Sequence, residues 1–287
     1  MYFIIGYVFL IVSKIKIIIG GYKSPKPFDF EDINRCIDYD LSIVNHWMNH
    51  LNIYTKTSNI KNKVILELGP GSDLGIGIKL LSLGAQKYNA CDVNNLARMT
   101  PEVFYIKFFD RLRADGCIID NLENQLKLHH EGKESDLNYV VDPSFDLNSS
   151  FDKQSIDLVF SQAAFEHFDD VELMISNLSD ICKKGAKLIA EVDLKAHSRW
   201  VRDNDPNSIY RYPGWLYNLV WYKGVPNRLR PYQYKEILEK YGWNDIVITP
   251  LQVSSRDNSA YSGIHKDFQD RKNEMNSLTI MLYATKQ

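Results

Sequence analysis

Two apolar segments of the sequence each end in an acidic residue, and the first runs directly into a glycine loop. The segment Val64–Gly77 reads VILELGPGSDLGIG, with Glu67 near the end of the apolar stretch and Gly69 and Gly71 behind it. A second apolar stretch, YNACDV, carries Asp92 at its tip. In α/β sheets ligands bind beyond the carboxyl ends of the strands, and glycines let the backbone approach a ligand closely. The pattern therefore predicts a nucleoside-binding half of an α/β sheet.

The acid in front of the glycine loop distinguishes between two kinds of nucleoside cofactor. A dinucleotide-binding loop has the spacing G-x-G-x-x-G and places a pyrophosphate at a helix N-terminus. Glu67 would repel a pyrophosphate but suits the cationic amino-acid end of S-adenosylmethionine, and the third glycine of the dinucleotide pattern is missing. An NAD(P)-dependent oxidoreductase is the less favoured alternative, because no Tyr-x-x-x-Lys pair follows the predicted fourth strand.

These motifs resemble those of the class I S-adenosylmethionine-dependent methyltransferases, from Lys63 to Leu194. The hydrophobic-E-x-G-x-G motif and Asp92 are followed by SIDLVFSQAAFEHFDD, Ser155–Asp170, which looks like the fourth strand of that family. The segment Leu178–Leu194 then looks like the next helix, a lysine-glycine turn and the fifth strand. The resemblance implies a doubly wound, seven-stranded, mostly parallel sheet of the Rossmann-like type. It also implies that Glu67 and the two glycines hold the methionine end of the cofactor.

The resemblance assigns further cofactor contacts. It implies that Asp92 binds the ribose hydroxyls, with a helix N-cap as the alternative role of this residue. An acid shortly before the fourth strand would contact the adenine, and this is Asp146, with Asp142 competing because the register of the loop is open. Ser161 and Gln162, at the end of that strand, would face the sulfonium.

Histidines follow the fourth and fifth predicted strands, where a base beside the cofactor would lie. His197 is the predicted general base for removing a proton from an acceptor hydroxyl, with Asp193 orienting it or binding substrate. His167, in Phe165–Phe168, is a second candidate base, but a histidine that only bonds backbone is an equal alternative. A capping aspartate with a surface histidine is the alternative for the first pair. No metal site is expected, because that pair lacks a clear third ligand.

Arginine and aromatic residues gather in the segment after the fifth strand. Such groups can bind phosphate, carboxylate or sugar, and they predict a substrate-binding role for Arg199, Arg228, Arg230 and Tyr212. The alternative is a packed lid in which arginines pair with acids such as Asp203 and Asp205.

The sequence predicts three regions of different character. Residues 1–22 form an apolar N-terminal segment, residues 23–62 a helical cap, and residues 63–287 the methyltransferase domain, with insertions at about 94–138 and 197–231. The 197–231 insertion is rich in arginine and aromatic residues.

The apolar N-terminal segment fits neither a full membrane span nor a signal peptide, because lysines interrupt it at positions 14 and 16. Peripheral membrane association through residues 1–20 is one interpretation, with the lysines at the headgroups. The alternatives are a strand or helix packed on the domain, or extra sequence upstream of the functional start. Four scattered cysteines without a C-x-x-C pair indicate free thiols in a reducing, cytoplasmic setting, with the inner membrane face as the site if the segment anchors.

The composition sets limits on the partners. A net charge of -2, with 24% charged residues, gives no general surface for nucleic acid. The absence of a proline-proline-aromatic motif after the fourth strand also argues against an exocyclic base amine as acceptor. The sequence therefore predicts O-methylation of a small-molecule or glycan or lipid-linked saccharide acceptor by S-adenosylmethionine. A non-catalytic cofactor-binding protein of the same fold is the alternative.

Overall fold

The structure is a computed structural model that describes residues 2–20, 32–254 and 261–287. Its seven strands form one sheet in the order β3-β2-β1-β4-β5-β7-β6, which is mostly parallel but mixed. The seven-stranded α/β prediction is therefore confirmed at this level. The strands are β1 (Val64–Leu68), β2 (Lys87–Asp92), β3 (Leu137–Val141), β4 (Ile156–Gln162), β5 (Cys182–Asp193), β6 (Trp243–Val253) and β7 (Ser277–Lys286).

The chain divides into two compact units, which are described separately. The first comprises Met1–Lys23, Ala163–Ile175 and Ala190–Ala284, and the second comprises Ser24–Gln162, Ser176–Ile189 and Thr285–Gln287. The first part of the predicted helical cap, residues 23–31, lies outside the described residues. We call the unit that contains Ala190–Ala284 the lid unit and the unit that contains Ser24–Gln162 the cofactor unit.

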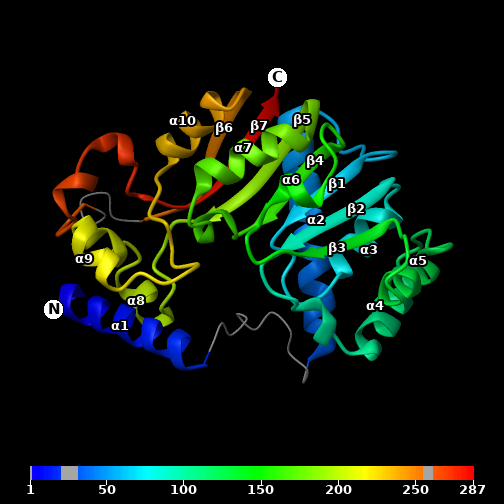
Figure 1. Cartoon of the computed structure of the whole chain (residues 1–287), viewed down its shortest axis with the longest axis horizontal. Helices are drawn as coiled ribbons and strands as arrows, with labels where there is room; N and C mark the ends of the chain where they lie inside the picture. Colours follow the sequence, from blue (N-terminus) through cyan, green and yellow to red (C-terminus); the bar gives the residue numbers. More distant parts are fainter. Residues whose placement is uncertain (1, 21–31, 255–260) are drawn as a thin grey trace. The chain divides into compact units, whose positions relative to one another are not determined.

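The cofactor unit is built on the parallel strands β3, β2, β1 and β4 (Figure 1). The side chains of β1 and β2 are almost all buried, as expected for parallel strands covered on both faces. β1 lies between β2 and β4, where the strand order reverses, and such a switch point is where open α/β sheets bind ligands. The helices of this unit are α2 (Ile33–Thr55), α3 (Gly75–Ser82), α4 (Glu102–Ala114), α5 (Leu122–His130) and α6 (Leu147–Ser150), with the 3-10 turn η1 (Ala97–Met99).

The helix α2 is one continuous amphipathic helix whose apolar side packs on the sheet. Asp32 caps its N-terminus by accepting from the backbone N–H of Arg35. The indole of Trp47, which is wholly buried, stacks on Phe160 of β4 with ring centroids 4.7 Å apart. Within residues 23–62, the range predicted as a helical cap, the described part of the chain has this helix.

The lid unit contains the N-terminal helix and most of the aromatic insertion. In Figure 1, α1 (Tyr2–Gly20) runs along α8 (Arg199–Asn204) and α9 (Gly214–Leu219). The tyrosine-rich core of this unit includes Tyr210, Tyr212 and Tyr217, and Tyr7 and Leu10 of α1 pack against it. Much of the segment predicted as the 197–231 insertion therefore packs into one hydrophobic core of this unit. The other elements of this unit are η2 (Phe165–His167), the first part of α7 (Val171–Ile181), η3 (Ser208–Arg211), α10 (Pro231–Lys240), η4 (Lys266–Phe268) and η5 (Arg271–Asn273).

One helix of the described chain, within Phe3–Gly20, is long and apolar enough to cross a membrane by length and composition. Only 6% of that stretch is buried. One side of this helix packs on the rest of the lid unit. There the hydroxyl of Tyr7 donates to the carbonyl of Leu216 at 3.1 Å. Lys14 donates to the carbonyl of Leu219 at 2.9 Å, so this ammonium is held by protein.

Candidate active site

The glycine loop after β1 has the backbone geometry that a close ligand contact needs. Gly69 (φ 73°) and Gly71 (φ 81°) lie in the left-handed region, which side chains disfavour. The N–H of Gly69 donates to the carbonyl of Cys91 at 3.0 Å, which ties the loop to the end of β2. The sequence pattern therefore corresponds to a real strand–loop–helix element, with α3 beginning at Gly75.

Asp92 lies at the tip of β2 beside this loop. Its carboxylate accepts from the N–H of Asn94 at 3.0 Å and from the N–H groups of Gly71 and Val93. Burial raises the pKa of Asp92, and these backbone donors lower it in turn. The carboxylate is thus fixed at the carboxyl end of β2 next to the glycines, where two ribose hydroxyls can reach it.

Glu67 lies beneath the loop instead of at its surface. The residue is 1% exposed, and its Oε2 accepts a hydrogen bond of 2.6 Å from the hydroxyl of Tyr88. Burial raises the pKa of Glu67 to about 8, so the carboxyl group is neutral near pH 7 in the unliganded chain. Glu67 supports the loop from beneath, and its contact to the methionine end of the cofactor, directly or through water, stays a prediction.

Two further acids that the sequence analysis missed lie against the loop. Asp73 accepts from the N–H of Gly75 at 2.9 Å, and Asp40 reaches the same place from α2. Oδ2 of Asp40 has no partner with hydrogen-bond geometry among the described residues, and burial followed by repulsion from Asp73 raises its pKa. Buried carboxyl groups of this kind fit a ligand that brings a positive charge. The sequence signal that could have revealed Asp40 was an acidic residue on the apolar side of a predicted helix.

The other predicted cofactor residues make hydrogen bonds within the cofactor unit. Asp146 caps α6 by accepting from the N–H groups of Asn148 and Ser149. Asp142 accepts from the backbone and hydroxyl of Ser144, which lowers its pKa. The hydroxyl of Ser161 donates to the carbonyl of Leu68 at 3.1 Å and so joins the ends of β4 and β1. Their adenine and sulfonium contacts stay predictions.

We expect Glu67→Gln to stabilise the cofactor-free protein increasingly as the pH rises. A carboxyl group whose pKa is raised on folding stabilises the fold below its unfolded pKa of 4.5, and that contribution is lost between 4.5 and about 8. The glutamine has no such loss and can still accept from Tyr88. Between pH 5 and pH 8 the difference in unfolding free energy should grow in favour of the variant, at most by about 1.4 kcal/mol per pH unit. Urea unfolding at three pH values measures it, and a pH-independent difference contradicts it.

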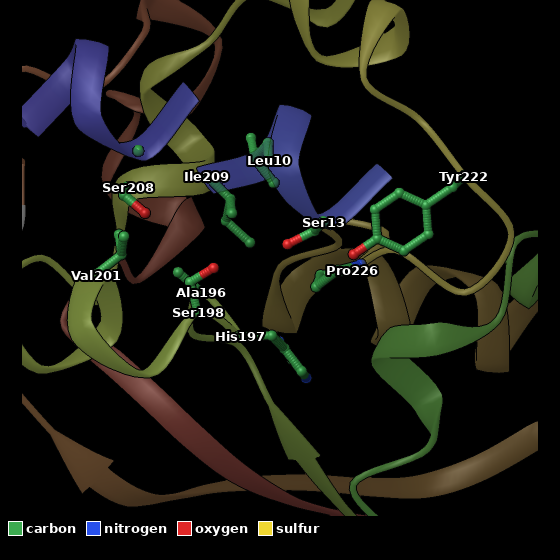
Figure 2. Close-up of a pocket in the computed structure, with 11 residues that line it drawn as sticks. Leu10, Ser13, Ala196, His197, Ser198, Val201, Ser208, Ile209, Tyr222 and Pro226 are labelled. Carbon is green, nitrogen blue, oxygen red and sulfur yellow. The ribbon is translucent and has the colours of Figure 1, made fainter. Parts of the chain in front are cut away.

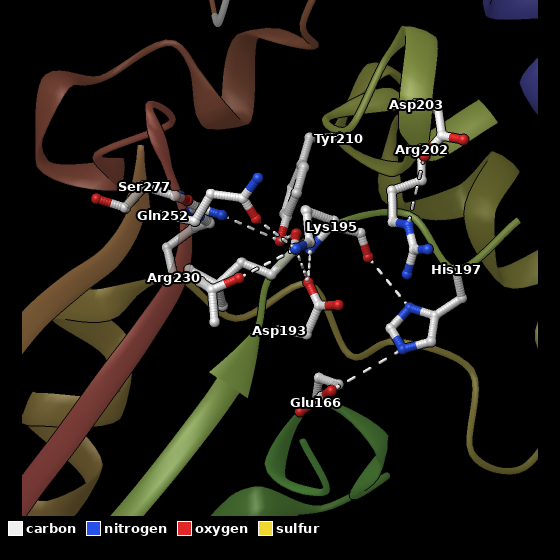
Figure 3. Close-up of polar contacts among 12 residues, drawn as sticks. Glu166, Asp193, Lys195, His197, Arg202, Asp203, Tyr210, Arg230, Gln252 and Ser277 are labelled. Atoms are coloured by element: carbon white, nitrogen blue, oxygen red, sulfur yellow. Dashed lines mark hydrogen bonds and ion pairs between the residues drawn. The ribbon is translucent and has the colours of Figure 1, made fainter. Parts of the chain in front are cut away.

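The histidine cluster lies in the lid unit. Glu166 and His167 are on η2, and His197 follows β5. Nε2 of His197 is 3.9 Å from Oε1 of Glu166 (Figure 3). The rings of His167 and His197 meet edge to face, with centroids 4.6 Å apart. One ligand atom from each of the three side chains lies within 4.8 Å of the others. The structure thus brings together the two histidines that the sequence analysis chose and an acid that it did not.

Each imidazole is oriented by a backbone carbonyl. Nδ1 of His167 lies 2.6 Å from the oxygen of Gly224, and Nδ1 of His197 lies 3.1 Å from the oxygen of Lys195. Because a carbonyl only accepts, both Nδ1 atoms carry the proton and both Nε2 atoms keep their lone pairs. Burial lowers the pKa of both histidines, and their proximity lowers that of His197 further. Both rings are neutral at pH 7.

Asp193 accepts a hydrogen bond from Lys195, and not from His197 as predicted. Its Oδ1 accepts from the N–H of Lys195 at 3.0 Å, and the ammonium of Lys195 is 3.6 Å from the same oxygen (Figure 3). The carbonyl of Lys195, and not the carboxylate, therefore orients His197. Asp193 still contributes negative charge, which helps to raise the pKa of the buried Glu166 after burial itself.

Glu166 is a buried acid without a side-chain partner. The residue is 2% exposed, and neither carboxyl oxygen has a partner with hydrogen-bond geometry in the described part of the chain. Burial raises its pKa well above the ordinary value, although nearby backbone N–H groups, including that of Asp193, oppose the shift. A native fold rarely keeps such a group unless it serves a ligand or a reaction.

The predicted substrate-binding arginines make contacts within the lid unit. Arg230 is wholly buried and donates to the carbonyls of Asn273, Glu274 and Ser277, at 2.8, 2.7 and 2.9 Å. Arg228 lies over the ring of Tyr217 at 4.1 Å. Substrate binding by either guanidinium would require these contacts to break.

Tyr212 and Arg211 also make the contacts that the packed-lid alternative predicts. The hydroxyl of Tyr212 donates to the carbonyl of Phe3 at 2.9 Å and so holds α1. Arg211 forms a two-point ion pair with Asp205, with the closer contact at 2.6 Å. Arg199 begins α8, and its side chain lies outside the described part of the structure.

A cavity of about 200 Å³ lies beside His197 in the lid unit. Figure 2 shows Leu10 and Ser13 of α1 on one side of it and His197 on the other. Apolar side chains alternate with hydroxyl groups around the cavity, which suits an acceptor that carries both. Its other lining residues are Gly6, Ala196, Ser198, Val201, Ser208, Ile209, Tyr222 and Pro226.

Comparison with known proteins identifies the central part of the chain. Residues 103–190, which run from α4 into β5, match a family described as a methyltransferase domain. This part of the chain is therefore similar to methyltransferase domains. No curated protein matches this methyltransferase.

Solved structures share the fold at low sequence identity. Phosphoethanolamine N-methyltransferase 2 of Haemonchus contortus, solved with S-adenosyl-L-methionine, aligns with a TM-score of 0.51 at 15% identity. The alignment covers 95% of this methyltransferase but 59% of that protein. A putative S-adenosylmethionine-dependent methyltransferase of Listeria monocytogenes aligns with a TM-score of 0.45 at 15% identity. The alignment covers 86% of this chain and 99% of that protein. A chain in the complex of the Haloferax volcanii Trm112 activator with a putative methyltransferase aligns with a TM-score of 0.45 at 15% identity. That alignment covers 92% of this chain and 98% of the other chain.

The predicted enzyme class is therefore confirmed. The domain match and the seven-stranded fold make the protein an S-adenosylmethionine-dependent methyltransferase, with S-adenosylmethionine as its cofactor. The glycine loop, Asp92 and the buried acids fit that cofactor.

Proposed function

We propose that this methyltransferase methylates a hydroxyl oxygen of a saccharide or other small acceptor. The observation that carries the proposal is the pair of imidazoles whose Nδ1–H groups are held by carbonyls and whose Nε2 atoms keep free lone pairs. A hydroxyl is a weak nucleophile, and its attack is helped by a base that removes the proton as the bond forms. An amine acceptor, once neutral, would need no such base before attack.

The residues of the cluster have distinct roles in this reaction. S-adenosylmethionine supplies an electrophilic methyl group. In the metal-free protein, Nε2 of His197 accepts the proton of the acceptor hydroxyl, and the carbonyl of Lys195 holds the ring in place through Nδ1. The carboxyl group of Glu166, with Oε1 3.9 Å from Nε2, faces the imidazolium that results. The rest of the lid unit would orient the acceptor and exclude water.

The cavity and α1 support a lipid-linked acceptor at a membrane surface. His197 and three residues of α1 line the same cavity, so an acceptor in it lies against this helix. The outer side of α1 is apolar and solvent-exposed: Ile4 and Ile18 are 69% exposed and Ile19 is 81% exposed. A helix of this kind binds at the boundary between headgroups and acyl chains. We therefore propose peripheral membrane association through residues 1–20 at the cytoplasmic face.

An acceptor assay with labelled S-adenosylmethionine tests the proposal. The acceptors are a water-soluble sugar, the same sugar on a polyprenyl phosphate in anionic vesicles, and a primary amine of similar size as control. We expect labelled methyl ether on a sugar hydroxyl, with the lipid-linked acceptor turned over faster, and no methylated amine. Methylation of the amine alone would overturn the O-methyl proposal, and equal rates for soluble and lipid-linked sugar would overturn the membrane part.

A non-catalytic cofactor-binding protein of the same fold is the second candidate. It would bind S-adenosylmethionine without forming S-adenosylhomocysteine in any acceptor mixture. The buried, unpaired Glu166 beside two histidines favours an enzyme, because a scaffold has no use for it.

A further inference from the structure

We propose that Glu166, His167 and His197 bind a divalent transition-metal ion, through the carboxylate and the Nε2 atoms of both imidazoles. Two imidazoles and one carboxylate form a ligand set that proteins use for Zn²⁺ and Fe²⁺ in catalytic sites with open positions. The sequence analysis rejected a metal because it paired His197 with Asp193 and lacked a third ligand. The structure provides two more, since Glu166 and His167 lie on the adjoining turn η2.

The imidazoles have the orientation that metal-binding histidines show. A ligating histidine almost always donates its other ring N–H to a carbonyl or carboxylate, which fixes the tautomer and the direction of the lone pair. Both rings satisfy this condition, through the oxygens of Gly224 and Lys195.

Glu166 is the second, independent indication. Its carboxyl group is 2% exposed, has no partner with hydrogen-bond geometry among the described residues, and points toward His197 (Figure 3). A buried carboxylate without a partner is costly, and a cation between it and the two lone pairs would satisfy all three groups at once.

The spacing allows an ion after small side-chain rotations. Metal–ligand distances of about 2.0–2.2 Å place neighbouring ligand atoms about 3 to 4 Å apart. Nε2 of His197 and Oε1 of Glu166 are already 3.9 Å apart, and one ligand atom from each of the three side chains lies within 4.8 Å of the others. Three protein ligands leave positions open for an oxygen from outside the protein.

In catalysis, which rests on the proposed function, the ion and a proton would compete for the lone pair of His197. With the ion bound, the acceptor hydroxyl would ligate it and lose its proton to solvent. The oxygen then forms a bond to the methyl carbon as the carbon–sulfur bond breaks, and the electron pair returns to sulfur to give S-adenosylhomocysteine. Metal binding itself does not depend on this step.

Titration of the chelator-treated, full-length protein with Co²⁺ and Zn²⁺ tests the proposal. Calorimetry gives the number of ions bound, and the visible absorption of Co²⁺ reports imidazole ligation. We expect one ion per chain, with affinity lowered at least ~10-fold in Glu166→Gln and in His197→Asn. The matched control is His50→Asn, which changes a histidine of a second histidine pair. His46 and His50 lie on successive turns of α2, with ring centroids 4.4 Å from each other.

The outcomes separate the metal site from the reaction. No binding, or binding lost in His50→Asn and kept in both cluster variants, would overturn the proposal. If a cluster variant does not fold, as judged by its thermal transition, the Co²⁺ spectrum of the wild type decides, because a spectrum without imidazole ligation overturns the proposal. Ion binding without O-methylation of any acceptor leaves this site standing and rejects the proposed function. Undiminished O-methylation in the presence of chelator, together with no ion binding, rejects this metal site and leaves the proposed function standing.

Discussion

His197→Ala should lower the turnover of O-methylation by ~10²-fold or more, which is the usual contribution of a positioned base. The substitution removes the free Nε2 that faces Glu166 and leaves that acid without its nearest cation-capable neighbour. The same loss is expected whether the lone pair takes a proton or holds a metal ion. The Michaelis constant for S-adenosylmethionine should change little, because the predicted cofactor residues belong to the cofactor unit.

Initial rates with the best acceptor, at saturating S-adenosylmethionine, measure the effect. The matched control is His130→Ala, an exposed histidine of α5 whose removal should leave the rate within twofold, about the size of ordinary surface substitutions. If His197→Ala retains more than half the wild-type rate while His130→Ala behaves as expected, the cluster does not carry the chemistry.

Asp92→Ala should weaken S-adenosylmethionine binding by ~100-fold or more. Two hydrogen bonds from ribose hydroxyls to a carboxylate each contribute about 1.5–3 kcal/mol, and each 1.4 kcal/mol is tenfold. The carboxylate also accepts from the N–H groups of Gly71 and Asn94, so its removal loosens the glycine loop as well. Calorimetry with S-adenosylmethionine and S-adenosylhomocysteine, with NAD as a negative control ligand, measures the change.

Asp92→Asn separates the two contributions. The asparagine keeps an oxygen for the N–H of Asn94 but loses the charge, so its affinity should fall between those of the wild type and the alanine variant. Asp110→Ala, at an exposed ion pair with Arg113 in the same unit, should bind like the wild type. Binding by Asp92→Ala within threefold of the wild type would show that ribose is held elsewhere.

The strand–loop elements could be predicted because their signals are local. Strands β1 and β2 are short apolar runs, each with an acid at or near its carboxyl end, and the glycines between β1 and α3 have the positive φ that their positions suggested. The fifth strand begins at Cys182, so the predicted lysine-glycine turn lies within it, where Gly185 has a φ of 83°.

The roles of polar side chains depended on contacts that no local pattern contains. Arg230 looks like a ligand for an anion in the sequence, but carbonyls more than 40 residues away occupy its donors. Glu166 was not among the predicted site residues, because the local sequence does not show that the packing of η2 buries it. Asp40 was hidden in the same way within an apolar helix face.

The position of α1 has a consequence for the synthesis of the protein. Its contact partner Leu216 lies 209 residues after Tyr7. At 5–20 residues per second, this apolar helix exists for about 10 to 40 seconds before the chain that covers its inner side has been made. During that interval the helix is exposed on all sides, so a membrane surface or a chaperone can bind it before its own insertion does. The order in which the partners become available, and not their final affinities alone, then decides where each newly made chain folds.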